Sequence, residues 1–73
     1  MIRILVADDH AVVRQGVKQI LADVSDMTVK DESQNGPETL KKVMEQEFDV
    51  VLLDISMPGR SGLEVLEDIK AQR

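Results

Sequence analysis

Residues 48–54 read Phe-Asp-Val-Val-Leu-Leu-Asp, and this stretch decides the fold class of the chain. Its central residues, 50–53, are all apolar and do not alternate with polar residues. A strand of this composition is expected to be covered on both faces, which is typical of a parallel sheet. The run at residues 2–7, Ile-Arg-Ile-Leu-Val-Ala, is also largely apolar and also stops at acidic residues. The sequence therefore predicts two buried parallel strands that each lead into carboxylates.

A helical pattern follows the first of these strands, at residues 11–23. Apolar residues recur at the spacing of one helix face, and polar residues fill the other face. The face predicted to pack on the sheet consists of Val12, Val13, Gly16, Val17, Ile20 and Leu21, and the opposite face consists of Arg14, Gln15, Lys18 and Gln19.

Three further segments complete the pattern. Residues 27–33 alternate weakly between apolar and polar side chains, which suits a partly exposed edge strand. The turn Asn-Gly-Pro at 35–37 opens a helix that runs to about Gln46, because proline is well tolerated at the first helical position. A last helix is predicted to begin at Ser61 or Gly62. The residues of these two helices that are expected to face inward are Leu40, Val43, Met44, Leu63, Leu66 and Ile69.

Strands and helices thus alternate in the order β-α-β-α-β-α. This order implies an α/β fold with a parallel sheet and right-handed crossovers. If the chain winds outward in opposite directions from the first strand, the strand order is 2-1-3. We therefore predict a flavodoxin-like sheet with helices on both faces, built from three βα units within residues 1–73.

The composition argues against several classes of function. The net charge of −5 disfavours a nucleic-acid contact, since phosphate backbones are held by clustered lysine and arginine. The chain has no cysteine, so disulfides and thiolate metal sites are excluded. No run approaches the roughly 18 apolar residues that a membrane helix needs, and nothing resembles a signal peptide. A cytoplasmic protein without a membrane contact is the expectation.

Acidic residues follow both buried strands: Asp8 and Asp9 after the first, and Asp54 after the other. Parallel strands share a direction, so these acids are expected at the same rim of the sheet, at the switch point where open α/β sheets bind ligands. Converging carboxylates repel one another, and a hard divalent cation such as Mg²⁺ relieves that repulsion. Such a cation can also neutralise charge as a phosphoryl group moves onto a carboxylate oxygen. The pattern indicates a Mg²⁺ site beside an aspartate that can accept a phosphoryl group.

Two runs carry a resemblance to a known family. Residues 5–10 read Leu-Val-Ala-Asp-Asp-His, and residues 50–59 read Val-Val-Leu-Leu-Asp-Ile-Ser-Met-Pro-Gly, followed by Gly62. With these runs, residues 1–73 resemble the N-terminal part of the receiver domain of bacterial two-component response regulators. His10, Arg14 and Gly16 resemble the NarL/FixJ-like subfamily, whose receivers are joined to a DNA-binding output domain that these 73 residues do not contain.

The resemblance implies a role for each matching residue. Asp54 would be the phosphoacceptor, charged by a sensor histidine kinase in a Mg²⁺-dependent reaction. Asp9 and Asp54 would bind Mg²⁺ directly, together with the backbone carbonyl of Ser56. Asp8 would act through a bound water. The implied function is transcription regulation by phosphorelay, in a phosphoprotein that is not an enzyme.

The family's domain has five βα units, whereas this sequence matches three, from the first strand to the third helix. Two family positions that hold phosphoryl oxygens, a Ser or Thr after strand four and a Lys after strand five, have no counterpart here. The strand Val50–Leu53 is then expected to form an unpaired apolar edge, which invites pairing with another chain. An alternative expectation is therefore a self-associating interaction module that accepts no phosphoryl group.

Simpler or competing roles exist for some of these residues. Asp8 and Asp9 could cap a helix. His10 is more simply a polar residue at the start of a helix than a catalytic group. A hydrolase that works through an aspartyl phosphate would typically show a second Asp two residues after the nucleophile. Ser56 occupies that position, which counts against an enzyme.

Overall fold

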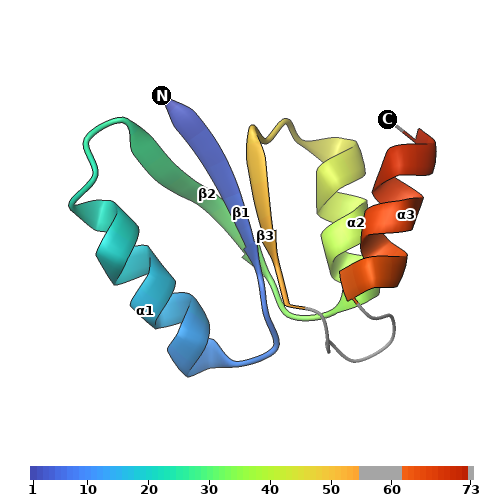
Figure 1. Ribbon diagram of the computed structural model, residues 1–73, viewed down its shortest axis with the longest axis horizontal. Coiled ribbons are helices and arrows are strands. Elements are labelled where there is room, and N and C mark those ends of the chain that lie inside the picture. The colour runs from blue at the N-terminus through green and yellow to red at the C-terminus, as the bar shows by residue number, and fades with distance from the viewer. Residues whose placement is uncertain (55–61, 73) are drawn as a thin grey trace.

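The computed structural model describes residues 1–54 and 62–72, in which three strands and three helices alternate along the chain (Figure 1). The strands are β1 (Ile2–Ala7), β2 (Met27–Ser33) and β3 (Val50–Leu53). The helices are α1 (Ala11–Ala22), α2 (Gly36–Glu45) and α3 (Gly62–Gln72). The predicted order of elements is confirmed, and the observed bounds lie close to the predicted ones.

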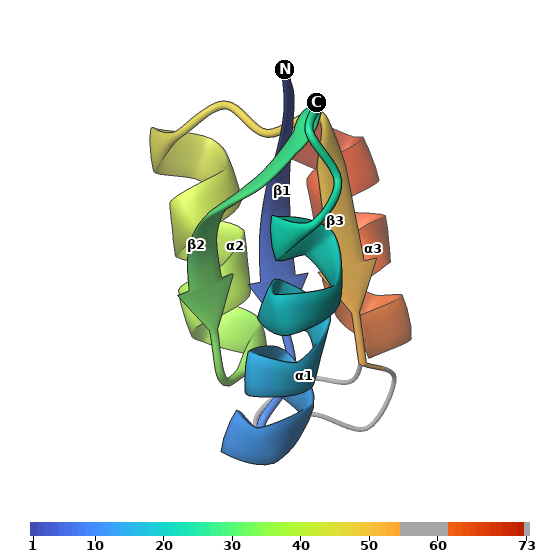
Figure 2. The same cartoon turned by 90° about the vertical axis from the view of Figure 1, so that its left-hand side faces the viewer.

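The strands form one parallel sheet in the order β2-β1-β3. Helix α1 covers one face, and α2 and α3 lie side by side on the other face (Figures 1 and 2). This is the flavodoxin-like arrangement that the sequence predicts, with β2 at an edge. Because β1 is central, the residues that follow it lie between the ends of two neighbouring strands.

Strand β1 forms the centre of the core. Residues 4–7 are buried, and Leu5 is fully enclosed. The register places Ala7 opposite Ser33 of β2 and opposite Leu53 of β3. The three strands therefore end level with one another, at one rim of the sheet.

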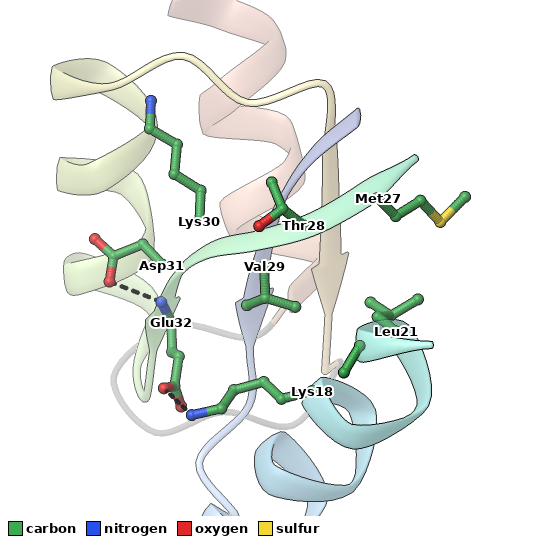
Figure 3. Close-up of a pocket in the computed structure, with 9 residues that line it drawn as sticks. Lys18, Leu21, Met27, Thr28, Val29, Lys30, Asp31 and Glu32 are labelled. Carbon is green, nitrogen blue, oxygen red and sulfur yellow. Dashed lines mark hydrogen bonds and ion pairs between the residues drawn. The ribbon is translucent and has the colours of Figure 1, made fainter. Parts of the chain in front are cut away.

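The predicted inward face of α1 is only partly correct, because Gly16, Val17 and Leu21 are half-buried. The other three residues that were expected to pack on the sheet, Val12, Val13 and Ile20, are 84%, 46% and 71% exposed. The side chains of Arg14 and Lys18, which were expected on the opposite face, reach Glu32 on β2. The Glu32 carboxylate accepts hydrogen bonds from Arg14 Nε at 3.0 Å and from Lys18 Nζ at 2.8 Å, the second of which is drawn in Figure 3. The predicted face was wrong at these positions because apolar periodicity does not register a charged partner on another element.

The prediction that β3 is covered on both faces was also wrong. Val50 and Leu52 are 39% and 42% exposed, whereas Val51 and Leu53 are half-buried. Alternate residues of a strand point to opposite faces, so one face of β3 is open. Helix α1 packs on β2 and β1 and leaves this part of the sheet uncovered.

The start of α2 follows from its sequence. The Asn35 side chain accepts a hydrogen bond from the Glu38 N–H at 2.8 Å and so caps the helix, with Pro37 in the first turn. Thr39 is buried, and its hydroxyl donates to the Asn35 carbonyl at 2.7 Å and lies 2.6 Å from the hydroxyl of Ser33. These bonds attach the first turn of α2 to the end of β2.

The inward faces of α2 and α3 were predicted in part. Val43 is buried and Leu40 and Ile69 are half-buried, whereas Met44 and Leu66 are exposed. The Leu63 side chain and residue Ser61 lie outside the described part of the structure. Within that part, no helix has the length and apolar character needed to cross a bilayer.

Candidate functional site

The ends of β1 and β3 bring acidic residues together. The Asp54 N–H donates a hydrogen bond to the Ala7 carbonyl at 2.9 Å, and the Asp8 N–H donates to the Ser33 carbonyl at 3.0 Å. These bonds continue the pairing of the strands one residue beyond β1 and β3. Asp8 and Asp54 therefore leave the sheet at the same rim, as the sequence predicts for parallel strands.

Asp8, Asp9, His10 and Asp54 form one cluster, which we call the acid cluster. One ligand atom from each residue lies within 4.8 Å of those of the others. The three carboxylates are partly buried, so their mutual repulsion is screened less than it would be on an open surface. Carboxylate oxygens that converge with access to water form the donor set that Mg²⁺ prefers. The residues present fit a Mg²⁺ ion.

The ring of His10 points into the acid cluster. Its Nδ1 lies 2.8 Å from Asp8 Oδ1, 2.9 Å from Asp9 Oδ1 and 3.9 Å from Asp54 Oδ2. The hydrogen bond with Asp8, together with the charge of Asp9, raises the pKa of His10 above its ordinary value. Burial favours the neutral form of Asp8, but hydrogen bonds from the backbone and ring of His10 outweigh burial and hold the pKa of Asp8 below its ordinary value.

The N-terminus of α1 shows which residue is the helix cap. His10 occupies the N-cap position, and its side chain makes no capping hydrogen bond. Asp8 accepts a hydrogen bond from the His10 N–H at 2.9 Å, one residue before the helix proper. The alternative that Asp8 and Asp9 are the helix cap is therefore wrong, because both acids precede the cap.

Arg14 is a residue of the site that was expected only on the polar face of a helix and as part of the NarL/FixJ-like resemblance. Its Nη1 donates to the Asp8 carbonyl at 2.6 Å, and its Nε donates to Glu32 at 3.0 Å. Arg14 thus ties the backbone of the acid cluster to both α1 and β2. An arginine one turn after His10, with an acid near the end of the predicted edge strand, is the sequence signal that could have indicated this pair.

Of three open grooves along the described part of the sheet, one reaches the acids. The smallest of the three, about 180 Å³, runs between Val6 and Leu52 of the sheet and Val13 of α1, and ends at Asp8 and Asp54. The groove of about 470 Å³ lies along β2 beside Lys18 (Figure 3), and the groove of about 330 Å³ lies beside Glu32 and Lys42. Neither of these two is lined by an aspartate of the acid cluster, so the smallest groove is the one that gives access to Asp8 and Asp54.

The structure thus brings together Asp8, Asp9 and Asp54, which are three of the four residues predicted for the site. Ser56, whose carbonyl was predicted to be a metal ligand, lies outside the described residues.

Comparison with known proteins gives the family. The family described as response regulator receiver domain matches residues 4–73, which is nearly the whole chain. The chain belongs to this family. A receiver domain is not an enzyme in the usual sense.

Curated relatives agree with the predicted subfamily. This receiver is 50% identical to the response regulator GacA of Pseudomonas viridiflava over 64 residues, which cover 88% of this chain and 30% of GacA. It is 40% identical to the nitrate/nitrite response regulator protein NarL of Escherichia coli K12 over 67 residues, which cover 92% of this chain and 31% of NarL. The chain therefore spans under a third of the length of these relatives. The resemblance to NarL/FixJ-like receivers is confirmed.

Solved receivers share the fold. The response regulator TrrA of Thermotoga maritima, crystallised with Mg²⁺ and BeF, matches with a TM-score of 0.91 and 42% identity over 100% of this chain and 62% of TrrA. TrrA has also been crystallised with the histidine kinase ThkA, and that copy matches with a TM-score of 0.87 over 61% of its length. The three βα units described above are thus a receiver fold.

Proposed function

We propose that Asp54 accepts a phosphoryl group from a sensor histidine kinase, in a reaction that depends on Mg²⁺. The observation that carries this proposal is the convergence of Asp8, Asp9 and Asp54 at one rim of a receiver sheet. Asp9, Asp54 and the Ser56 carbonyl would hold the metal, and Asp8 would hold it through a water. Residues 1–73 would then form part of a receiver domain.

In this proposal Asp54 carries out a single nucleophilic displacement at phosphorus. An oxygen of the Asp54 carboxylate forms a bond to phosphorus while the bond from phosphorus to the donor nitrogen breaks, and the leaving imidazole takes up a proton. A bound Mg²⁺ supplies charge neutralisation for the phosphoryl oxygens. The backbone bond from Asp54 to Ala7 holds the acceptor beside Asp8 and Asp9, so the nucleophile is oriented before the donor arrives.

The partner and output form part of the same proposal. TrrA, which is similar to this chain, was crystallised with a histidine kinase and, separately, with Mg²⁺ and BeF, which supports a kinase partner and a magnesium cofactor. Control of transcription is proposed as the output, because the sequence resembles NarL/FixJ-like receivers that are joined to DNA-binding domains. A cytoplasmic location is proposed on the same ground.

The proposal is tested with the 73-residue chain, Mg²⁺ and phosphoramidate as a small phosphodonor, by intact-mass spectrometry. We expect a phosphoryl adduct that disappears without Mg²⁺ and in Asp54→Asn. Asp23→Asn, an exposed aspartate beyond α1, is the matched control and keeps the adduct. The absence of an adduct in chain shown to be folded by circular dichroism would contradict phosphoryl acceptance.

A second candidate function is self-association through the strand Val50–Leu53. The exposure of Val50 and Leu52 favours this candidate, since an apolar strand face on a small protein is a docking surface for another apolar surface. Sedimentation velocity should show a dimer or larger species that Leu52→Lys reduces. Met44→Lys, which changes an equally exposed residue on α2, should leave the association intact. A compact monomer at all concentrations would rule this candidate out.

A further inference from the structure

The imidazole of His10 lies among the oxygens that would bind the metal. Its Nδ1 is within hydrogen-bond distance of Asp8 Oδ1 and Asp9 Oδ1, and it is 3.9 Å from Asp54 Oδ2. Ligand oxygens lie about 2.1 Å from Mg²⁺, so an ion shared by these carboxylates must enter the gap in which Nδ1 lies. The ring and the ion therefore cannot both keep these positions.

The direction of the hydrogen bonds decides whether His10 helps or opposes the ion. An ionised carboxylate only accepts hydrogen bonds, so an Nδ1 that approaches two carboxylates at 2.8 and 2.9 Å must carry the hydrogen. A nitrogen that binds a metal must instead present a lone pair. In this geometry Nδ1 is a donor to the acids rather than a ligand for the ion.

We infer that His10 competes with the divalent cation for the acid cluster, and that its ring must swing out before the ion binds. This inference rests on the proposed function, because it concerns the same metal site. His10 would then set the metal concentration at which the receiver becomes competent to accept a phosphoryl group.

The local structure allows the ring to leave. The His10 side chain is 62% exposed and makes no capping bond to α1. The backbone bonds of His10, to Asp8 Oδ1 at 2.9 Å and from the Arg14 N–H at 3.1 Å, do not involve the ring. Removing the ring should therefore leave the start of α1 and the position of Asp8 unchanged.

The test is Mn²⁺ binding, followed by electron paramagnetic resonance at one fixed pH and ionic strength. His10→Ala should bind Mn²⁺ about three- to tenfold more tightly, because the Nδ1–H that is hydrogen-bonded to Asp8 and lies 2.9 Å from Asp9 no longer opposes the ion, and solvent limits the size of this effect. Lys41→Ala removes a cation from the exposed face of α2 and controls for net charge, so its affinity should change by less than about twofold.

The outcomes separate this inference from the proposed function. If Asp9→Asn abolishes binding while His10→Ala binds as the unmodified chain does, the metal site stands and the competition is overturned. Weaker binding by His10→Ala overturns it too, and would make the ring a ligand. If neither the unmodified chain nor His10→Ala binds Mn²⁺, the metal site and the inference fail together.

Nuclear magnetic resonance gives a second reading that does not depend on affinity. His10 is the only histidine of the chain, so its ring signals are assigned without ambiguity. Saturating Mg²⁺ should move the Nδ1 and ring-proton shifts toward those of a histidine in a free peptide. Ring shifts that stay unchanged while Mg²⁺ binds would contradict the displacement of the ring.

Discussion

At the scale of single residues, the half-buried Glu32 connects the edge strand β2 to α1. Its carboxylate accepts hydrogen bonds from Lys18 and Arg14, and Arg14 also donates a hydrogen bond to the Asp8 carbonyl at the acid cluster. The hydrogen bond from Lys18 lowers the pKa of Glu32, and although burial acts in the opposite direction, Arg14 lowers it further. A surface acid thereby contributes to the orientation of the candidate site.

This depressed pKa makes the stability contribution of Glu32 depend on pH. A group with a lower pKa in the folded state stabilises the fold fully above its unfolded pKa, here about 4.3, and loses that contribution as the pH falls through its folded value. Glu32→Gln should therefore lower the free energy of unfolding at about pH 7, and the difference from the unmodified chain should shrink toward about pH 3. Urea unfolding followed by circular dichroism measures both values. An equal difference at the two pH values would contradict the ion-pair role.

Side-chain positions that follow from strand direction could be predicted from the sequence. Positions that depend on the choice of a side-chain rotamer could not. Asp8 and Asp54 were expected together because two apolar runs end in acids and parallel strands share a rim. The position of the His10 ring depends on a rotamer chosen among three carboxylates, and no sequence period encodes that choice. The pattern of apolar residues likewise does not predict the hydrogen bond from Arg14 to the Asp8 carbonyl.

At the scale of elements, β2 is attached to a helix on each face of the sheet. Glu32 points toward α1, and the neighbouring Asp31 accepts hydrogen bonds from Lys42 Nζ at 3.0 Å and Gln46 Nε2 at 2.9 Å, at the end of α2. Lys42 also donates to the Glu32 carbonyl. The alternation of side chains along a strand thus directs one acid to each layer, and an edge strand with few apolar contacts is held by polar ones.

Lys42→Met should therefore destabilise the fold by about 1 kcal/mol, since it leaves a half-buried Asp31 and a backbone carbonyl without their cationic donor. The matched control is Lys41→Met, on the exposed side of the same helix, which should change the free energy of unfolding by less than about 0.5 kcal/mol. Equal effects of the two substitutions in urea unfolding would show that Lys42 acts as an ordinary surface lysine.

The elements themselves follow from the sequence more directly than their orientation does. Asn35 and Pro37 mark the start of α2, and the apolar runs mark β1 and β3. The face that α1 presents was only partly predictable from its own residues, because Arg14 and Lys18 reach Glu32 on another element and Val12 is exposed. An amphipathic pattern predicts that a helix forms, and charged contacts with other elements influence which of its faces turns toward the sheet.

At the scale of the whole molecule, the core is small and centred on one strand. Leu5 is fully buried on β1, and few other large side chains in the described part of the chain are enclosed. A chain of this size buries only about 60% of the surface that it exposes when unfolded, so each core side chain carries a large share of the stability.

Leu5→Ala should accordingly lower the free energy of unfolding by about 2–5 kcal/mol, which is comparable to the whole stability of a marginal small domain. Val12→Ala removes a similar apolar side chain that is already exposed, and it should change stability by less than about 0.5 kcal/mol. Thermal unfolding by circular dichroism compares the two. A native-like transition in Leu5→Ala would show that the core does not depend on β1.

The pairing of β1 with β3 also determines how early the sheet can form during synthesis. Arg3 at the start of β1 is hydrogen-bonded to Asp49, 46 positions along the chain, and no shorter connection brings these strands together. A ribosome that adds about 5–20 residues per second delivers β3 roughly 2–9 seconds after β1. Through that interval the nascent chain displays the apolar run of β1 without its second neighbour. The acid cluster, which brings Asp54 beside Asp8 and Asp9, therefore cannot assemble before β3 has been synthesised.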